Sequence, residues 1–454
     1  MIQDLELPIG FRSEIIEPVF AALKAGVSCS LVGVGSSGKS NVARHLVRLD
    51  VRRRYLGDYA SNVLTAYVDC QKLSEYSIQS LHSQILESLP RAVQSTRPNA
   101  EDLVSQLESL WRQCVGDSSP DRVRRTLEVA IANTLRAGIA QIFIILDDFD
   151  PVVGNAPSRV LNSLRALRDD YKLKLVYVTI TRKELAFLRN QGEYEDFYEI
   201  ATEKLIAIGP YREEDATFMI DRLCNRWGFA QRLSDEEIRR LLEVSGCHAG
   251  LLKAILWAAR QDASLNLAAP DLVERLRGHK DVEPECEKIW ESLERAEIAD
   301  LSALVSRGWP LGAGVQPLLK KGLIRERLDG TYDVFTPLFA EFIWDNLPDG
   351  RFAIKLIPDR REARIHDRVI KNFHPVGFEL LSALYRQRPA PVSRRDLFER
   401  MADAERGGHR LPGPTEQRLA GYLAEVKRKI DTEQQEYVLL EPDGSYRLIG
   451  PDGK

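Results

Sequence analysis

The stretch that decides the fold reads SLVGVGSSGKS over residues 30–40. It follows the spacing GxxxxGK[ST], in which Gly33, Gly38, Lys39 and Ser40 hold the fixed positions. An apolar run ends at Gly33 and a helical pattern begins near Lys39, so this loop joins a strand to a helix. In that context, a glycine-rich loop turns its backbone amides toward phosphate oxygens.

The residue types of this loop predict separate roles in phosphate binding. We expect Lys39 to reach the β and γ phosphates of a nucleotide, and the Ser40 hydroxyl to ligate Mg²⁺. The expected ligands are therefore ATP or ADP with Mg²⁺. The candidate binding loop comprises Gly33, Gly35, Ser36, Ser37, Gly38, Lys39, Ser40 and Asn41. The alternative is a glycine-rich turn that matches the motif by chance.

A second segment supports the first. Residues 141–148 are an apolar run that ends in Asp147 and Asp148, and such runs suit a parallel strand covered on both faces. We expect Asp147 to hold Mg²⁺ and Asp148 to orient the attacking water, which makes Lys39, Asp147 and Asp148 the candidate catalytic residues. The alternative is a strand followed by an acidic turn.

Two more strands complete a minimal sheet, over residues 64–70 and 173–182. The second ends in Thr181 and Arg182, on the side where ligands bind in open α/β sheets. These two residues either sense the γ-phosphate or simply end the strand. Alternating strands and helical stretches predict an α/β fold with a doubly wound parallel sheet. Residues 91–121 read as an insertion between strands that could be mobile.

Composition and charge narrow the function classes. The 454 residues are enough for about three domains, and 44% hydrophobic with 29% charged residues argues against a disordered chain or a coiled-coil rod. The N-terminus lacks a signal-peptide pattern, no apolar run is long enough to span a membrane, and the six cysteines form no CxxC pair. We expect a reduced, cytoplasmic protein.

Residues 355–454 hold 19 Lys and Arg against 16 Asp and Glu, a net charge of +3, which permits DNA binding.

Several of these segments together resemble a known group. Residues 9–14, the phosphate loop, residues 67–70 and residues 146–148 resemble the STAND branch of AAA-like P-loop NTPases and the related origin-recognition initiator ATPases. The resemblance covers about residues 8–350. It implies that Phe11 and Arg12 help to hold adenine and that Thr181 and Arg182 act as a nucleotide sensor.

The same resemblance implies a helical lid after the sheet. Residues 206–210, which end in Pro210, resemble the start of that lid, and residues 245–252 resemble its Gly-Gly-His-Pro segment. His248 within that segment is expected to be structural, at a helix start. Fast AAA ATPases carry Glu where this chain has Asp148, so the resemblance implies slow hydrolysis by a nucleotide-gated switch.

The C-terminal third predicts two winged-helix domains. Residues 286–350 read as helices followed by a hairpin with Asp329-Gly330 at its tip, and we expect this first winged helix to pack without touching DNA. Residues 355–454 resemble the effector domain of OmpR-type response regulators, with a long helix near Pro414–Ile430 and a final hairpin. That resemblance implies DNA contacts from Arg418, Tyr422, Lys427, Arg428 and Arg447. The modest charge leaves protein recognition open.

These observations lead to one functional hypothesis with an alternative. The expected domains are a P-loop domain over 1–204, a helical lid over 205–285, a first winged helix over 286–350 and an OmpR-like winged helix over 351–454. We expect an ATP-binding switch, a slow ATPase whose nucleotide state controls binding to double-stranded DNA and assembly into a homo-oligomer or with a protein partner. The alternative is a signalling or defence scaffold whose winged helices bind proteins.

Overall fold

The structure is a computed structural model of the 454-residue chain. It divides into two compact units, which we call unit 1 (residues 1–294 and 320–323) and unit 2 (residues 295–319 and 324–454). It describes residues 6–117, 119–229, 231–262, 264–310, 312–347, 354–357, 361–365, 368–387, 390–406, 415–431 and 436–448. Pro414, expected in the first turn of a helix, lies outside these residues.

Unit 1 is built on a five-stranded sheet of order β2-β3-β4-β1-β5. Every neighbouring pair is parallel, as a strand–helix alternation requires. The α/β fold and the parallel sheet predicted from the sequence are thus confirmed. The strands are β1 (Cys29–Val32), β2 (Val63–Asp69), β3 (Gln141–Asp147), β4 (Leu175–Thr181) and β5 (Lys204–Ala207).

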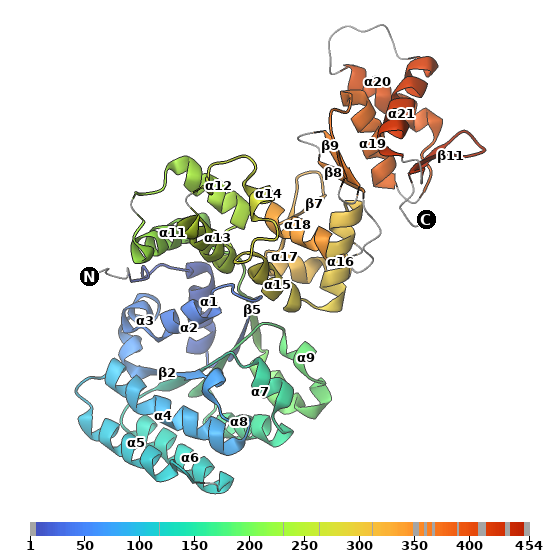
Figure 1. The fold of residues 1–454 in the computed structure, drawn as a ribbon. Coiled ribbons are helices and arrows are strands. Elements are labelled where there is room, and N and C mark those ends of the chain that lie inside the picture. Colours follow the sequence, from blue (N-terminus) through green and yellow to red (C-terminus); the bar gives the residue numbers. More distant parts are fainter. Residues whose placement is uncertain are drawn as a thin grey trace. The chain divides into compact units, whose positions relative to one another are not determined.

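Helices cover both faces of this sheet (Figure 1). Along β3, Phe143 and Ile145 belong to the core on one face, whereas Ile142, Ile144 and Leu146 belong to the core on the other. Alternate side chains of a strand point to opposite faces, so burial on both sides explains the unbroken apolar run. The first face carries α1 (Ser13–Lys24), α2 (Lys39–Val47) and α3 (Leu49–Leu56); the second carries α4 (Ile78–Thr96), α5 (Glu101–Cys114), α6 (Pro120–Arg136), α7 (Asp150–Asn155), α8 (Ser158–Asp170) and α10 (Glu195–Ala201).

Two features of this unit were not predicted from the sequence. The segment 91–121, which we read as a mobile insertion, continues α4, forms α5 and begins α6. Its apolar side chains Val93, Leu103 and Leu107 are buried in the core of the second face, which outweighs the turn-like residues around them. The fifth strand, β5, also went unpredicted, because only four residues pair with β1 and two of them are exposed.

The remainder of unit 1 is helical. Helix α12 begins with a capping box between Ser234 and Glu237. Five helices follow the sheet: α11 (Glu213–Trp227), α12 (Asp235–Ser245), α13 (Ala249–Gln261), α14 (Leu272–Leu276) and α15 (Glu283–Glu291). Across the described part of the chain, no helix combines the length and the apolar character needed to cross a membrane.

Unit 2 contains two small helix-and-hairpin arrangements. The predicted Asp329-Gly330 turn is confirmed, since it joins two short antiparallel strands. The first arrangement comprises α16 (Arg295–Arg307), α17 (Val315–Lys320), β6 (Ile324–Glu326), β7 (Tyr332–Val334) and α18 (Pro337–Asp345). The second comprises β8 (Ile354–Ile357), β9 (Glu362–Ile365), β10 (Arg368–Ile370), α19 (Pro375–Gln387), α20 (Arg394–Arg406), α21 (Glu416–Ile430), β11 (Val438–Leu440) and β12 (Tyr446–Leu448).

Candidate nucleotide site

The phosphate loop leaves β1 at the carboxyl edge of the sheet. Gly38 lies in the left-handed region, with φ of 89°, and immediately precedes α2. An added Cβ on Gly33 would lie 2.5 Å from Ser37 Oγ and 2.9 Å from the Ile208 carbonyl oxygen. Both glycines are therefore required by the loop itself, one for its dihedral angle and one for close packing.

Lys39 is the first residue of α2 and is almost fully buried. Its ammonium donates to the carbonyl oxygens of Gly33 and Val34, both at 2.9 Å. Burial lowers the pKa of Lys39 to about 8, although the nearby Asp150 carboxylate acts to raise it. The side chain is thus held inside the loop, where a phosphate could replace the carbonyl acceptors.

Strand order places the polar ends of two strands beside the loop. Strand β4 pairs with β1 on one side and with β3 on the other. Thr181 and Arg182, at its end, therefore lie between the phosphate loop and Asp147. A backbone hydrogen bond joins the two segments, since Gly33 N donates to Thr181 O at 3.1 Å. The Thr181 hydroxyl donates to the Lys183 carbonyl at 2.6 Å, whereas Arg182 lines the adjacent cleft.

Asp147 ends β3 as a buried carboxylate in contact with Ser40. Its oxygens accept hydrogen bonds from Tyr67 Oη at 2.9 Å, from Asp148 N at 3.1 Å and from the Ser40 hydroxyl. Burial raises the pKa of Asp147, while the bonds from Tyr67 and Ser40 oppose this. A hydroxyl and a carboxylate in contact are the hard oxygen donors that Mg²⁺ prefers, so these residues fit the ion and would hold it together with nucleotide oxygens.

Two further carboxylates follow Asp147. Asp148 has a left-handed φ of 50°, and its Oδ2 accepts from Gln71 Nε2 at 2.9 Å. Asp150 accepts from Arg182 N at 2.8 Å, and burial raises its pKa. The sequence interpretation missed Asp150, although the run Leu146-Asp147-Asp148-Phe149-Asp150 offered a third carboxylate beside the first two.

A cleft of about 580 Å³ opens beside the loop. Its described walls carry seven cationic side chains and two carboxylates, so the cleft favours a polyanion. The cations are Lys39, Arg44, Arg182, Arg222, Arg226, Lys253 and Lys288; the carboxylates are Asp148 and Glu285. Gly35, Ser36, Gly38, Ser40 and Asn41 also line it. Apolar contact comes from Tyr211, Met219 and Leu223.

The residues expected to hold adenine contact other residues of unit 1 near the cleft. Arg12 is buried and donates to the carbonyl oxygens of Gly209 and Pro210, both at 2.8 Å. Phe11 packs against Tyr211, with ring centroids 5.5 Å apart. Among the described residues that line the cleft are Tyr211 and Asn41 but not Phe11, Arg12 or Pro210. Phe11, Arg12 and Pro210 instead position Tyr211, whose hydroxyl accepts a hydrogen bond from Asn41 Nδ2 at 3.4 Å.

Residues far along the chain pack against the phosphate loop. The His248 side chain caps α13 by accepting from Leu251 N, which confirms its predicted place at a helix start, and it also hydrogen-bonds the backbone of Gly35. Burial lowers the pKa of His248 to about 4, so the ring is neutral. Gly250 N donates to Ser36 O at 3.0 Å. Glu285, Lys288 and Ser292 also lie here, and no motif in the sequence marks them.

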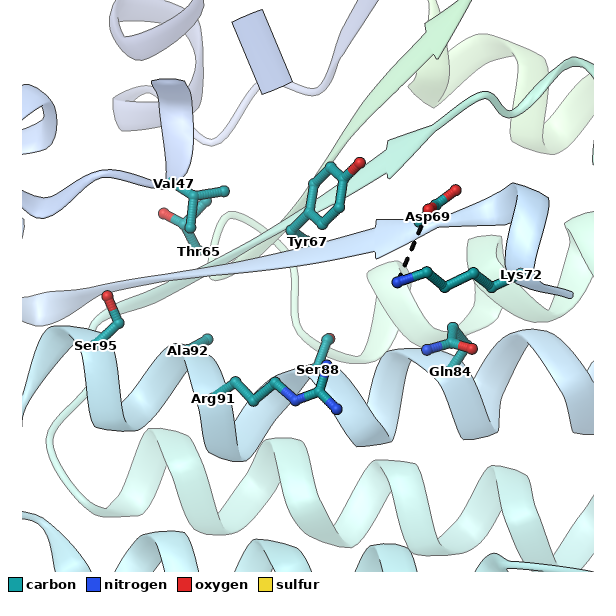
Figure 2. Close-up of a pocket in the computed structure, with 10 residues that line it drawn as sticks. All are labelled: Val47, Thr65, Tyr67, Asp69, Lys72, Gln84, Ser88, Arg91, Ala92 and Ser95. Atoms are coloured by element: carbon teal, nitrogen blue, oxygen red, sulfur yellow. Dashed lines mark ion pairs between the residues drawn. The ribbon is translucent and has the colours of Figure 1, made fainter. Parts of the chain in front are cut away.

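A smaller pocket of about 160 Å³ lies along β2. Figure 2 shows Gln84, Ser88 and Arg91 of α4 facing this strand across it. Tyr67 lines the pocket, and its hydroxyl donates to Asp147. The two cations in its wall, Lys72 and Arg91, form ion pairs with Asp69 at 3.9 Å and with Glu87 at 2.7 Å. Both cations of this pocket therefore lie beside a carboxylate.

The candidate DNA-binding residues lie on α21 and the hairpin that follows it. Lys427 contacts Glu436 at 3.1 Å and Asp431 at 3.6 Å, and Arg447 contacts Glu441 at 2.8 Å. Arg418 lies 3.5 Å from the Tyr422 hydroxyl. Arg428 is exposed, on a face that otherwise presents Gln417, Ala420, Gly421 and Ala424.

Comparisons with known proteins agree with this geometry. Residues 25–184, which hold the phosphate loop and strands β1 to β4 of the sheet, match the family described as AAA domain, a P-loop NTPase domain. A search of curated proteins gave no match.

Several solved structures resemble the chain at low identity. A Walker-type ATPase of Pyrococcus abyssi is 16% identical, with 76% of this chain and 99% of that chain covered and a TM-score of 0.43. The Aeropyrum pernix ORC2 protein, solved in ADPNP–ADP complexes, is 14% identical, with 75% and 94% covered and a TM-score of 0.42. The Aeropyrum pernix ORC1 protein in complex with DNA is 15% identical, with 100% and 91% covered and a TM-score of 0.37.

Proposed function

We propose that this chain is an ATP-binding switch that hydrolyses ATP slowly and uses its nucleotide state to control the action of unit 2. The observation that carries the proposal is that Lys39, Ser40 and Arg182 line one cationic cleft, with the buried Asp147 in contact with Ser40. Lys39 would bind the phosphates, and Ser40 with Asp147 would hold Mg²⁺. When bound, the ion would neutralise charge that develops on the phosphates.

Slow turnover is supported by the state of Asp148. Its carboxylate accepts the Gln71 amide, and its left-handed backbone angle constrains where it points. A general base must lie within hydrogen-bond reach of the water that it activates. Asp148 would have to reach that water while Gln71 holds its Oδ2, which restricts the carboxylate and suits a switch that holds its nucleotide for a long time.

We further propose that unit 2 is the output. We infer that both of its helix-and-hairpin arrangements are winged helices, and that the second contacts double-stranded DNA through Arg418, Tyr422, Lys427, Arg428 and Arg447. Within the expected domains 1–204, 205–285, 286–350 and 351–454, we place the end of the lid at Glu294, where the compact units divide. Nucleotide-dependent assembly into a homo-oligomer or with a protein partner is part of the same proposal.

One observation favours the alternative of a protein-binding scaffold. Lys427 and Arg447 already contact carboxylates of unit 2, and the exposed face of α21 is mostly small and uncharged. DNA affinity depends on cations that are available to phosphates. A surface of this kind also suits a protein partner.

Nucleotide binding tests the central proposal. We expect wild type to bind ATP with Mg²⁺, and Lys39→Ala to bind at least 100-fold more weakly, about 2.7 kcal/mol. Lys24→Ala, an exposed lysine at the end of α1, is the matched control. Equal affinity in wild type and Lys39→Ala would refute the assignment of the loop.

DNA binding separates the two outputs. Fluorescence anisotropy on duplex DNA, measured without nucleotide, with ADP and with ATP·Mg²⁺ across a salt series, should show salt-sensitive binding that changes with nucleotide. Absence of binding in all three states would favour the protein-binding scaffold.

A further inference from the structure

Helix α15 lies directly on the outer side of the phosphate loop. Gly35 N donates to Ser292 Oγ at 2.8 Å, and Ser292 Oγ donates to Lys288 O at 2.6 Å. A Cβ on Gly35 would lie 2.4 Å from the carbonyl oxygen of Lys288. The loop thus has glycine at this position because the last turn of α15 leaves no room for a side chain.

An ion pair of α15 faces the cleft beside this contact. Lys288 Nζ lies 2.6 Å from Glu285 Oε1, and both residues line the cleft. The Ser36 hydroxyl of the loop donates to the same carboxylate, and Oε2 would lie 2.4 Å from a Cβ on Gly250. Burial alone would raise the pKa of Glu285, but the bonds from Lys288 and Ser36 lower it. A carboxylate is therefore held ionised against the phosphate loop.

The pair lines the same cleft as the groups expected at a terminal phosphate. Asp148 and Arg182 line both the cleft and an adjoining pocket of about 310 Å³. Glu291 and Ser292 of the α15 segment line that second pocket. Asp148 and Arg182 are the groups that would act at the γ-phosphate, and residues of the α15 segment line both cavities that these two groups line.

We propose that Lys288 reads the γ-phosphate of bound ATP by exchanging Glu285 for the phosphate. This inference rests on the proposed function. An ammonium group has three donors and prefers the more highly charged oxygen acceptor. Glu285, only 16% exposed, would lose its partner and face a second anion. ADP lacks the γ-phosphate and leaves the pair intact, so the two nucleotides give α15 different environments.

The end of α15 connects this exchange to the rest of the chain. Lys183, which follows Arg182, donates to Leu293 O at 3.1 Å and contacts Glu294 at 3.2 Å. Arg295, the next residue, is the first of unit 2. A change in α15 would therefore reach the start of unit 2 through residues 292–294.

Equilibrium binding of ATP and ADP, with Mg²⁺ and the full chain, tests the proposal. For Lys288→Ala we expect ATP to bind about tenfold more weakly and ADP within about twofold of wild type. Lys288→Arg should retain most of the preference for ATP. Glu285→Gln should strengthen ATP binding more in the wild-type background, where it also releases Lys288, than beside Lys288→Ala. Lys280→Ala, an exposed lysine just before α15, is the control.

Other outcomes have distinct meanings. An equal loss of ATP and ADP affinity in Lys288→Ala, or no loss of either, overturns the inference and leaves the proposed function standing. If wild type binds neither nucleotide, the proposed function fails and the inference with it. Hydrogen exchange of residues 283–294 gives a second readout. ATP but not ADP should change it in wild type, and neither should in Lys288→Ala.

Discussion

The nucleotide cleft of unit 1 and the outward face of α21 in unit 2 both present basic side chains, but these side chains are engaged differently. In the cleft, the Lys39 ammonium donates to the backbone carbonyl oxygens of Gly33 and Val34, which a phosphate can replace, although Lys288 pairs with Glu285. On α21 and its hairpin, Lys427 and Arg447 contact carboxylates. An incoming phosphate must compete with those carboxylates, and exposed ion pairs are worth at most about 1 kcal/mol each.

This difference shows why counts of basic residues are a poor guide to anion binding. The described walls of the cleft carry seven cations and two carboxylates, and the walls are concave. Converging cations with low-dielectric walls raise the local concentration of a polyanion. The α21 face is exposed and partly neutralised, so its affinity should depend much more on salt. The predictions below run from the largest expected effect to the smallest.

Asp147→Asn should reduce ATP hydrolysis by about 100-fold, because it removes the carboxylate that would hold Mg²⁺ with Ser40. Nucleotide binding measured without Mg²⁺ should change little. Asp170→Asn, exposed at the end of α8, is the matched control. A loss of binding without Mg²⁺ would instead indicate that Asp147 supports the shape of the loop.

The two regions also contain glycines with opposite surroundings. Gly35→Ala should lower the free energy of unfolding by about 1–3 kcal/mol, because its Cβ meets the backbone of α15. Gly421→Ala should raise it by up to about 1 kcal/mol, because nothing lies within 4 Å and alanine favours the helix. Urea unfolding measures both, with hydrogen exchange assigning each change to its unit. A neutral Gly35→Ala would show that α15 does not lie on the loop.

The sheet wall of the cleft could be predicted from the sequence, whereas the opposite wall could not. Local spacing reveals the loop around Lys39, and burial on both faces produces the apolar run that ends in Asp147. Those signals are local in the chain. Glu285, Lys288 and Ser292 reach Gly35 and Ser36 only through tertiary packing, from about 250 positions away. Amphipathic helices such as α15 carry no mark of which side chains meet a ligand.

The resemblance also implied roles for side chains that already have hydrogen-bond or ion-pair partners in the structure. Arg12 was expected at adenine, but its guanidinium is occupied by the carbonyl oxygens of Gly209 and Pro210. Lys427 and Arg447 were expected at DNA, and both contact carboxylates in the described structure. A motif predicts the backbone position of a residue, but the hydrogen-bond acceptors around its side chain determine which ligands the side chain can still bind.

The pH dependence of nucleotide affinity tests the state of Lys39. Burial lowers its pKa to about 8, and a bound phosphate would raise that pKa again. Below pH 8, the Lys39 ammonium is already charged, so its titration should not change nucleotide affinity. Above pH 8, binding must take up a proton, so affinity should fall roughly tenfold between pH 8 and 9.5. Lys39→Arg, whose guanidinium stays charged, should show no such decline.

The smallest effect is expected on α21, where it separates DNA from protein recognition. Arg428→Ala should weaken binding to duplex DNA about two- to threefold and reduce the slope of log affinity against log salt by about one phosphate contact. Lys427→Ala should change the slope less, because Lys427 already contacts Glu436 and Asp431. Arg395→Ala on α20, paired with Glu399, is the control. If Arg428→Ala and Arg395→Ala leave the slope equally unchanged, this face of α21 does not bind the phosphate backbone, and its uncharged residues become the better candidate for a protein contact.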